Sequence, residues 1–176
     1  MTSHVLASPL MDALVRNDYQ QKFIAGESKT PQATFSDHVT GKKAVTIQKA
    51  KEYVDAIKDS RLNYEAASLF FGTVPVMTGD KYQQNPLALE ILQERESRER
   101  KELKTSVREA LTLSDGNLYL EDRNIIMNYT LEYIDEIVVE VTLLASFAEL
   151  LGVTVEELIQ NRMTYLQTLG FMRKGN

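Results

Sequence analysis

The sequence predicts an all-α protein, a helical bundle around one long helix that is both acidic and apolar. Glycine and proline are scarce, with eight and four residues among 176, and most of them lie before residue 86. Long runs of Leu, Glu, Lys and Arg follow, and these residues favour helices. We expect one domain over 1–176, with N-terminal helices and loops in 1–86 and a second set of helices in 87–176.

The N-terminal part is predicted to hold helices separated by two connections. Leu10, Leu14 and Phe23 are spaced as on one face of a helix, and Ile47, Val54 and Ile57 repeat this pattern. A stretch rich in Ser, Thr, Gly and His between them is typical of a loop. The expected segments are a helix over 9–26, a loop over 27–42, helices over 44–59 and 64–71, and a turn-rich connection over 72–86.

The C-terminal part is predicted to contain three helices. Pro86 suits the first turn of a helix, Gly152 suits a helix end, and Thr154 suits an N-cap. The expected helices cover 87–111, 122–151 and 154–169, with a loop over 112–117. The central helix is apolar on most sides, so we expect it to be buried in an oligomer.

Within the central helix, the first half of the segment 131–151 carries four carboxylates, Glu132, Asp135, Glu136 and Glu140. At about 100° per residue they cover an arc of roughly 140° beside an apolar surface. Carboxylates next to buried surface are costly unless they are paired or hold a cation. The arc therefore predicts a divalent metal site, and its alternative is the solvated edge of an amphipathic helix.

Composition restricts the kind of site that is possible. The chain has no cysteine, which excludes thiolate metal sites, and its two histidines, His4 and His38, are far from the acidic helix in the sequence. Any metal is therefore expected to bind oxygen ligands, as Mg²⁺ or Mn²⁺ does. The net charge of -5 argues against a nucleic-acid partner. No signal peptide is visible and the apolar helix has too many acids for a membrane span, so we expect a cytoplasmic protein with no membrane partner.

Three motifs follow one another in the second half of the chain. The first is Glu99-x-x-Glu102 and the second is Glu132-x-x-Asp135. Each spacing of three places two carboxylates on one helical face. The third is Leu-Gly-Val-x-x-Glu-Glu over 151–157. In this order, residues 94–176 resemble the all-α nucleoside triphosphate pyrophosphohydrolases, which include the MazG-like enzymes, dimeric dUTPases and phage dCTPases.

The resemblance implies Mg²⁺-dependent hydrolysis of a ribo- or deoxynucleoside triphosphate to the monophosphate and pyrophosphate, by a homodimer or homotetramer. Mn²⁺ is the alternative metal. The roles that it implies are metal binding by Glu99, Glu102, Glu132 and Asp135, catalysis by Glu102 and Asp135, and substrate contact by Asn161 and Tyr165.

Other interpretations stay open at this point. Glu52 and Asp55 form a rival first carboxylate pair, and Glu99 and Glu102 can instead belong to a ladder of surface ion pairs. The main alternative function is a non-enzymatic helical protein, such as an inhibitor, adaptor or assembly factor, that uses the apolar helix as an interface. A third, a DNA-binding helix-turn-helix over 147–160, is disfavoured by the acids at 156 and 157.

Overall fold

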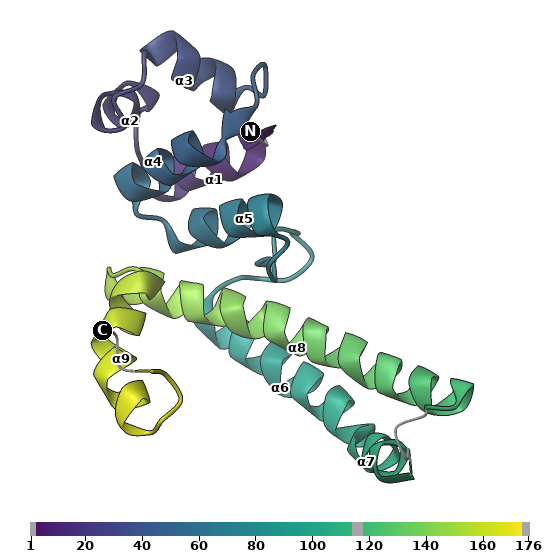
Figure 1. The fold of residues 1–176 in the computed structure, drawn as a ribbon. Coiled ribbons are helices and arrows are strands. Elements are labelled where there is room, and N and C mark those ends of the chain that lie inside the picture. The colour runs from purple at the N-terminus through teal and green to yellow at the C-terminus, as the bar shows by residue number, and fades with distance from the viewer. Residues whose placement is uncertain (1–2, 114–117, 174–176) are drawn as a thin grey trace. The chain divides into compact units, whose positions relative to one another are not determined.

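The computed structural model describes residues 3–113 and 118–173 and is mostly helical, with 72% helix (Figure 1). The predicted fold class is therefore confirmed. A single two-residue antiparallel pairing, Ser3 with Thr46 and His4 with Val45, is the β-structure of the described residues. The elements are β1 (Ser3–His4), α1 (Ala7–Arg16), α2 (Gln21–Glu27), α3 (Gln32–Val39), β2 (Val45–Thr46), α4 (Ile47–Ile57), α5 (Ser60–Phe71), α6 (Pro86–Glu102), α7 (Lys104–Leu113), α8 (Leu120–Leu151) and α9 (Val155–Thr168).

The chain divides into two compact units. Unit 1 comprises Met1–Pro75 and Phe147–Asn176, and unit 2 comprises Val76–Ser146. Unit 1 thus contains α1 to α5, the last turn of α8 and α9, whereas unit 2 contains α6, α7 and most of α8. The expectation of one domain with a division near residue 86 stays a prediction.

The core of unit 1 lies among α1 to α5. Its largest fully buried side chains include Tyr53, Phe35, Leu10 and Ile24. The rings of Phe35 and Tyr53 meet edge to face with their centroids 5.0 Å apart, a geometry that aromatic pairs favour. The Tyr53 hydroxyl also lies 2.7 Å from Nδ1 of His38, so the two buried polar groups satisfy each other.

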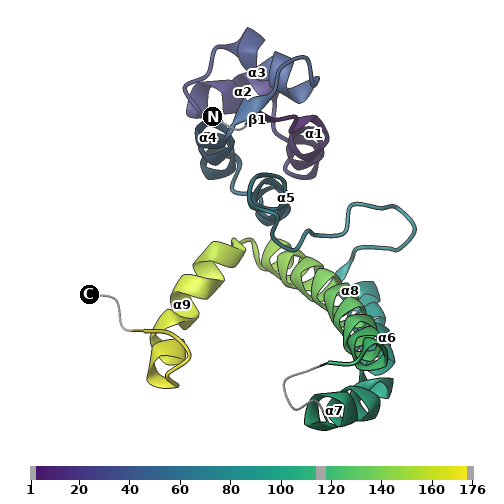
Figure 2. The same cartoon turned by 45° about the vertical axis from the view of Figure 1, so that its right-hand side comes forward.

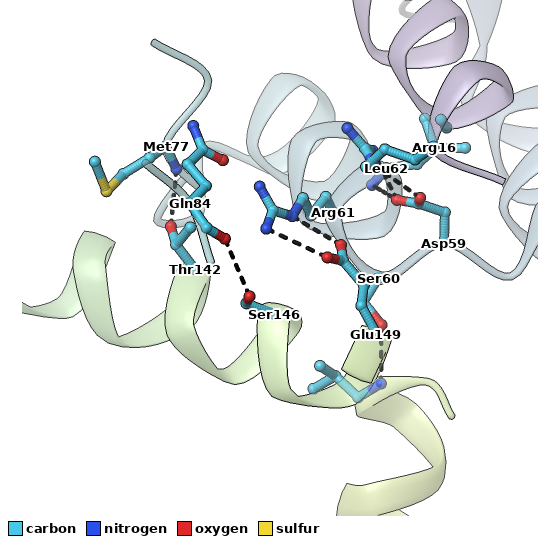
Figure 3. Close-up of polar contacts among 12 residues, drawn as sticks. Arg16, Asp59, Ser60, Arg61, Leu62, Met77, Gln84, Thr142, Ser146 and Glu149 are labelled. Atoms are coloured by element: carbon cyan, nitrogen blue, oxygen red, sulfur yellow. Dashed lines mark hydrogen bonds and ion pairs between the residues drawn. The ribbon is translucent and has the colours of Figure 1, made fainter. Parts of the chain in front are cut away.

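Polar contacts tie the segments of unit 1 together (Figure 3). Asp59 caps α5 by accepting a hydrogen bond from the Leu62 backbone N–H at 2.8 Å, and it also pairs with Arg16. Arg61 donates to Glu149 at 2.8 Å across 88 positions of the sequence. The Ser60 hydroxyl accepts from the Val155 N–H at 2.9 Å. The C-terminal segment is therefore held against the start of α5 by specific contacts.

Unit 2 is an antiparallel pair formed by α6 and α8, with α7 following α6 (Figures 1 and 2). Apolar side chains are buried in the half of the pair where α6 begins, among them Leu89, Leu92, Val139 and Ala145. At this end the Thr142 hydroxyl accepts from the Met77 N–H at 2.9 Å, and the Ser146 hydroxyl donates to the Gln84 carbonyl at 3.1 Å (Figure 3). These bonds fix the connection over 76–85 against α8.

Two expected segments of the N-terminal part differ from the structure. The helix predicted over 9–26 is interrupted at 17–20, where Asp18 has a φ of 50° and the Asn17 side chain turns to Asp59. The loop predicted over 27–42 contains α3, so that prediction is wrong. This helix buries only Phe35, His38 and Val39, and so short an apolar stripe gives no clear helical period.

The C-terminal helices agree better with prediction. The helix expected over 87–111 is broken at Leu103 into α6 and α7, and most of the predicted loop over 112–117 lies outside the described residues. The last two helices begin and end within two residues of their expected bounds, and Gly152 between them has a φ of 68°. In the described chain no single helix is long and apolar enough to cross a membrane. Only α8 and α9 taken together reach that length and composition, and they bend by 102° at their junction.

Candidate metal centre

Three carboxylates of unit 2 converge between α6 and α8. Glu96 and Glu99 lie one turn apart on α6, and Glu132 reaches them from the antiparallel α8. One oxygen from each residue lies within 4.8 Å of the others. Glu96 is buried, Glu132 is half-buried and Glu99 is exposed, so the cluster opens to solvent on one side. Three such oxygens can hold a metal ion, and they suit a hard cation.

Arg95 is the cationic neighbour of this cluster. Its Nε donates to Glu96 at 3.1 Å and lies 3.8 Å from Glu99. Hydrogen bonds to Glu96 and Tyr82 raise the pKa of Arg95, so it is charged at every pH at which the protein is folded. Arg95 therefore offsets part of the negative charge, and a bound cation has to compete with it for Glu96.

A polar seam beside the cluster positions the two helices. We use "polar seam" for Gln93, Ser97 and Arg100 of α6 with Glu136 of α8. Arg100 forms an ion pair with Glu136, and its Nη1 donates to the Tyr129 hydroxyl at 2.7 Å. Burial raises the pKa of Glu136, but hydrogen bonds from Arg100 and Ser97 outweigh it and leave that pKa below its ordinary value. Glu136 is therefore an ionised, fully partnered group that fixes the register of α6 against α8.

The structure places the six predicted site residues in different surroundings. Glu99 and Glu132 are brought together in the carboxylate cluster. Glu102 is the last residue of α6 and is exposed, and Asp135 is exposed on α8; within the described residues neither belongs to the carboxylate cluster. Asn161 and Tyr165 are on α9 in unit 1. Asn161 lines an open hollow of about 580 Å³ beside α5, and Tyr165 stacks under Arg162.

Glu96 is the ligand candidate that sequence reasoning missed. Glu96-x-x-Glu99 has the same spacing as Glu99-x-x-Glu102 one turn earlier, so the signal was present in the sequence. The choice between them depends on the register of α6 against α8, which the spacing alone does not contain. The rival pair has other partners, because Glu52 pairs with Lys49, and Asp55 lies 3.9 Å from Lys51.

An amphipathic helix is expected to bury its apolar face and expose its acids, and α8 differs from this pattern on two faces. Glu136, from the middle of the acidic arc, faces α6 and is only 3% exposed. Met127, Leu131 and Ile134 share another face of α8, and they are 59%, 51% and 43% exposed. We call these three residues the apolar stripe of α8. In unit 2 the paired interface is thus partly polar, while an apolar face is open.

Comparison with protein families, with curated proteins and with solved structures finds no match for this chain. The function is therefore inferred from the residues and their geometry.

Proposed function

We propose that unit 2 binds Mg²⁺ or Mn²⁺ through Glu96, Glu99 and Glu132, and that the protein uses the metal to hydrolyse a nucleoside triphosphate to the monophosphate and pyrophosphate. One observation carries the proposal: an E-x-x-E pair on one helix and the first acid of an E-x-x-D pair on its antiparallel neighbour supply oxygens within 4.8 Å of one another. Two or three carboxylates leave room for water and phosphate oxygens around Mg²⁺.

In the proposed reaction, a water oxygen bonds to the α-phosphorus, and the bond from that phosphorus to the oxygen bridging the α and β positions breaks. Pyrophosphate leaves with the electron pair, and the water proton passes to a carboxylate. A bound divalent ion would neutralise charge on the phosphates. Glu102 and Asp135 are the residues that the resemblance assigns to orienting or deprotonating the water. Arg98 and Lys101, which line a hollow of about 330 Å³ on α6, are suited to contact phosphate.

The test is pyrophosphate release from a panel of ribo- and deoxynucleoside triphosphates with Mg²⁺ and then Mn²⁺. The parent is compared with Glu132→Gln and Asp135→Asn, which both remove one charge from α8. Manganese binding by the free protein is measured in parallel. We expect Glu132→Gln to weaken manganese binding by about 10- to 100-fold and to abolish release.

The two variants separate the ligand sets. Loss of manganese binding in Glu132→Gln alone supports the cluster with Glu96. An equal loss of manganese binding in Asp135→Asn supports the E-x-x-D pair of the resemblance as the ligand set. A folded parent that binds no manganese at millimolar concentration and releases no pyrophosphate would overturn the proposal.

A second candidate is the non-enzymatic interaction protein, and the apolar stripe of α8 favours it. An exposed face of Met127, Leu131 and Ile134 on one helix is a common feature of protein–protein interfaces. If this stripe joins copies of the chain, Leu131→Gln lowers the mass measured by light scattering, while the exposed control Asn128→Gln leaves it unchanged. An unchanged mass in Leu131→Gln would count against self-association through this stripe.

A further inference from the structure

Helices α2 and α3 are joined by a short, well-ordered turn. Four residues, 28–31, separate them, and Lys29 has a φ of 49°, which reverses the chain direction. Ser28 and Thr30 are buried: the Ser28 hydroxyl donates to the Ile24 carbonyl at 2.7 Å, and the Thr30 N–H donates to the Ala25 carbonyl at 2.8 Å. Figures 1 and 2 show the two helices crossing. Two crossing helices with a turn of this length form a helix-turn-helix motif.

Other helices of unit 1 pack against this motif. Ile24 of α2, together with Phe35 and Val39 of α3, belongs to the same buried core as Leu10 of α1 and Tyr53 of α4. Helices α1 and α4 pack against α3 and α2 respectively. The inner faces of both helices are therefore fixed, and α3 lies at the end of unit 1 away from α5 (Figure 2).

The exposed side of α3 carries side chains of types that can contact base edges. Gln32 and Ala33 are exposed, and Ser36 and Asp37 are half-buried. These four positions occupy the side of this eight-residue helix that is not buried by Phe35, His38 and Val39, with Gln32 at its first turn. Glutamine pairs with adenine through two hydrogen bonds, serine bonds to several bases, and alanine contacts the thymine methyl group.

Positive charge is concentrated around this motif. Residues 21–57 contain six Lys and four Asp or Glu, so their net charge of +2 leaves -7 on the rest of the chain. Lys22 of α2, Lys29 of the turn and Lys42 after α3 are exposed and form no ion pair within 3–113 and 118–173. Lys43 pairs with Asp37 at 2.8 Å. The overall charge of -5, which argues against nucleic acid, therefore hides a segment, 21–57, whose net charge is positive.

We propose that unit 1 binds duplex DNA with α3 in the major groove, where Gln32, Ala33 and Ser36 contact base edges. Lys22, Lys29 and Lys42 contact phosphates on either side. This assignment matches the docking of helix-turn-helix proteins, in which the second helix reads bases and the first crosses the backbone. It is independent of the metal chemistry proposed for unit 2.

The experiment measures binding of the full chain to a labelled 30-base-pair duplex of mixed sequence, by fluorescence anisotropy over a salt series. The test variant is Lys22→Gln/Lys29→Gln/Lys42→Gln. Its matched control, Lys81→Gln/Lys104→Gln/Arg108→Gln, removes three exposed positive charges from unit 2. Of the two triple variants, we expect only the test variant to bind more weakly than the parent. Its slope of log K against log salt should be smaller in magnitude than that of the parent by about three.

Base-specific recognition of DNA by α3 is tested by selecting duplexes that bind the protein from a randomised pool. On the selected sequence, Gln32→Ala is expected to lose roughly 10- to 100-fold in affinity while keeping its affinity for the mixed-sequence duplex. Three results would overturn the proposal: no binding by the folded parent at 50 mM salt, equal loss in the control triple variant, or tighter binding to single strands or RNA than to the duplex. Circular dichroism of each variant establishes that it is folded.

Discussion

At the scale of single residues, Asp59 is a buried acid of unit 1 with several hydrogen-bond partners. It is 5% exposed and accepts hydrogen bonds from Arg16, from the Asn17 amide and from the Leu62 backbone. Removing one member of a buried pair leaves its partners unsatisfied. We expect Asp59→Asn to lower the free energy of unfolding in urea by about 3 kcal/mol. Asp37→Asn, which breaks the exposed pair with Lys43, is the control and should cost far less.

The same carboxylate makes stability depend on pH. Burial raises the pKa of Asp59, but the hydrogen bonds from Arg16 and Leu62 outweigh this effect and hold the pKa below its ordinary value. Because the folded state binds this proton less readily than the unfolded state, the stabilisation is complete above the unfolded pKa of about 4 and is lost as pH falls through the folded value. Urea titrations from pH 7 to pH 3 should show this loss in the parent. A similar pH dependence in Asp59→Asn would contradict the assignment.

At the scale of elements, substitutions at the ends of α4 and α5 should change stability in opposite directions. Both helices end on a left-handed residue, Lys58 with a φ of 56° and Gly72 with a φ of 66°. A side chain disfavours this conformation, whereas glycine does not. Lys58→Gly should therefore raise the thermal midpoint, with a gain of about 0.5–1 kcal/mol, and Gly72→Ala should lower it with a cost of about 1 kcal/mol. A Cβ at Gly72 meets nothing within 4 Å, so a larger loss would mean that more than the backbone is involved.

Helix boundaries are predicted well from the sequence where residues with strong capping preferences mark them. Thr154 forms a capping box with Glu157, and Gly152 takes the left-handed conformation, so the junction of the last two helices follows from local chemistry. The helix over 32–39 was missed because a tertiary core, not periodicity, stabilises it. In the carboxylate cluster, Glu99 and Glu132 were predictable from spacing. The spacing also allows Glu96, but choosing it over Glu102 requires knowing how α6 and α8 pair.

At the scale of the whole molecule, the two units should differ in local stability. Unit 1 buries large apolar side chains such as Phe35 and Tyr53, whereas the middle of the α6–α8 pair is the polar seam. Amides in α4 and α5 should therefore exchange with deuterium more slowly than those in α6, as mass spectrometry of peptides can measure. In Asp59→Asn, exchange should speed up in α4 and α5 and not in α6. Equal acceleration in both units would show that they unfold together.

The chain leaves unit 1 at Pro75 and re-enters it at Phe147, which has a consequence for the order of folding. Contacts such as Arg61 with Glu149 and Ser60 with Val155 join residues 88 and 95 positions apart and must close loops of that length. For a flexible loop of that length the entropic cost is on the order of 4 kcal/mol. Pairing of α6 with α8 brings residues 84 and 146 within hydrogen-bond distance and so shortens the effective loop. We expect the inserted hairpin to form early and to lower the entropic barrier for completing unit 1.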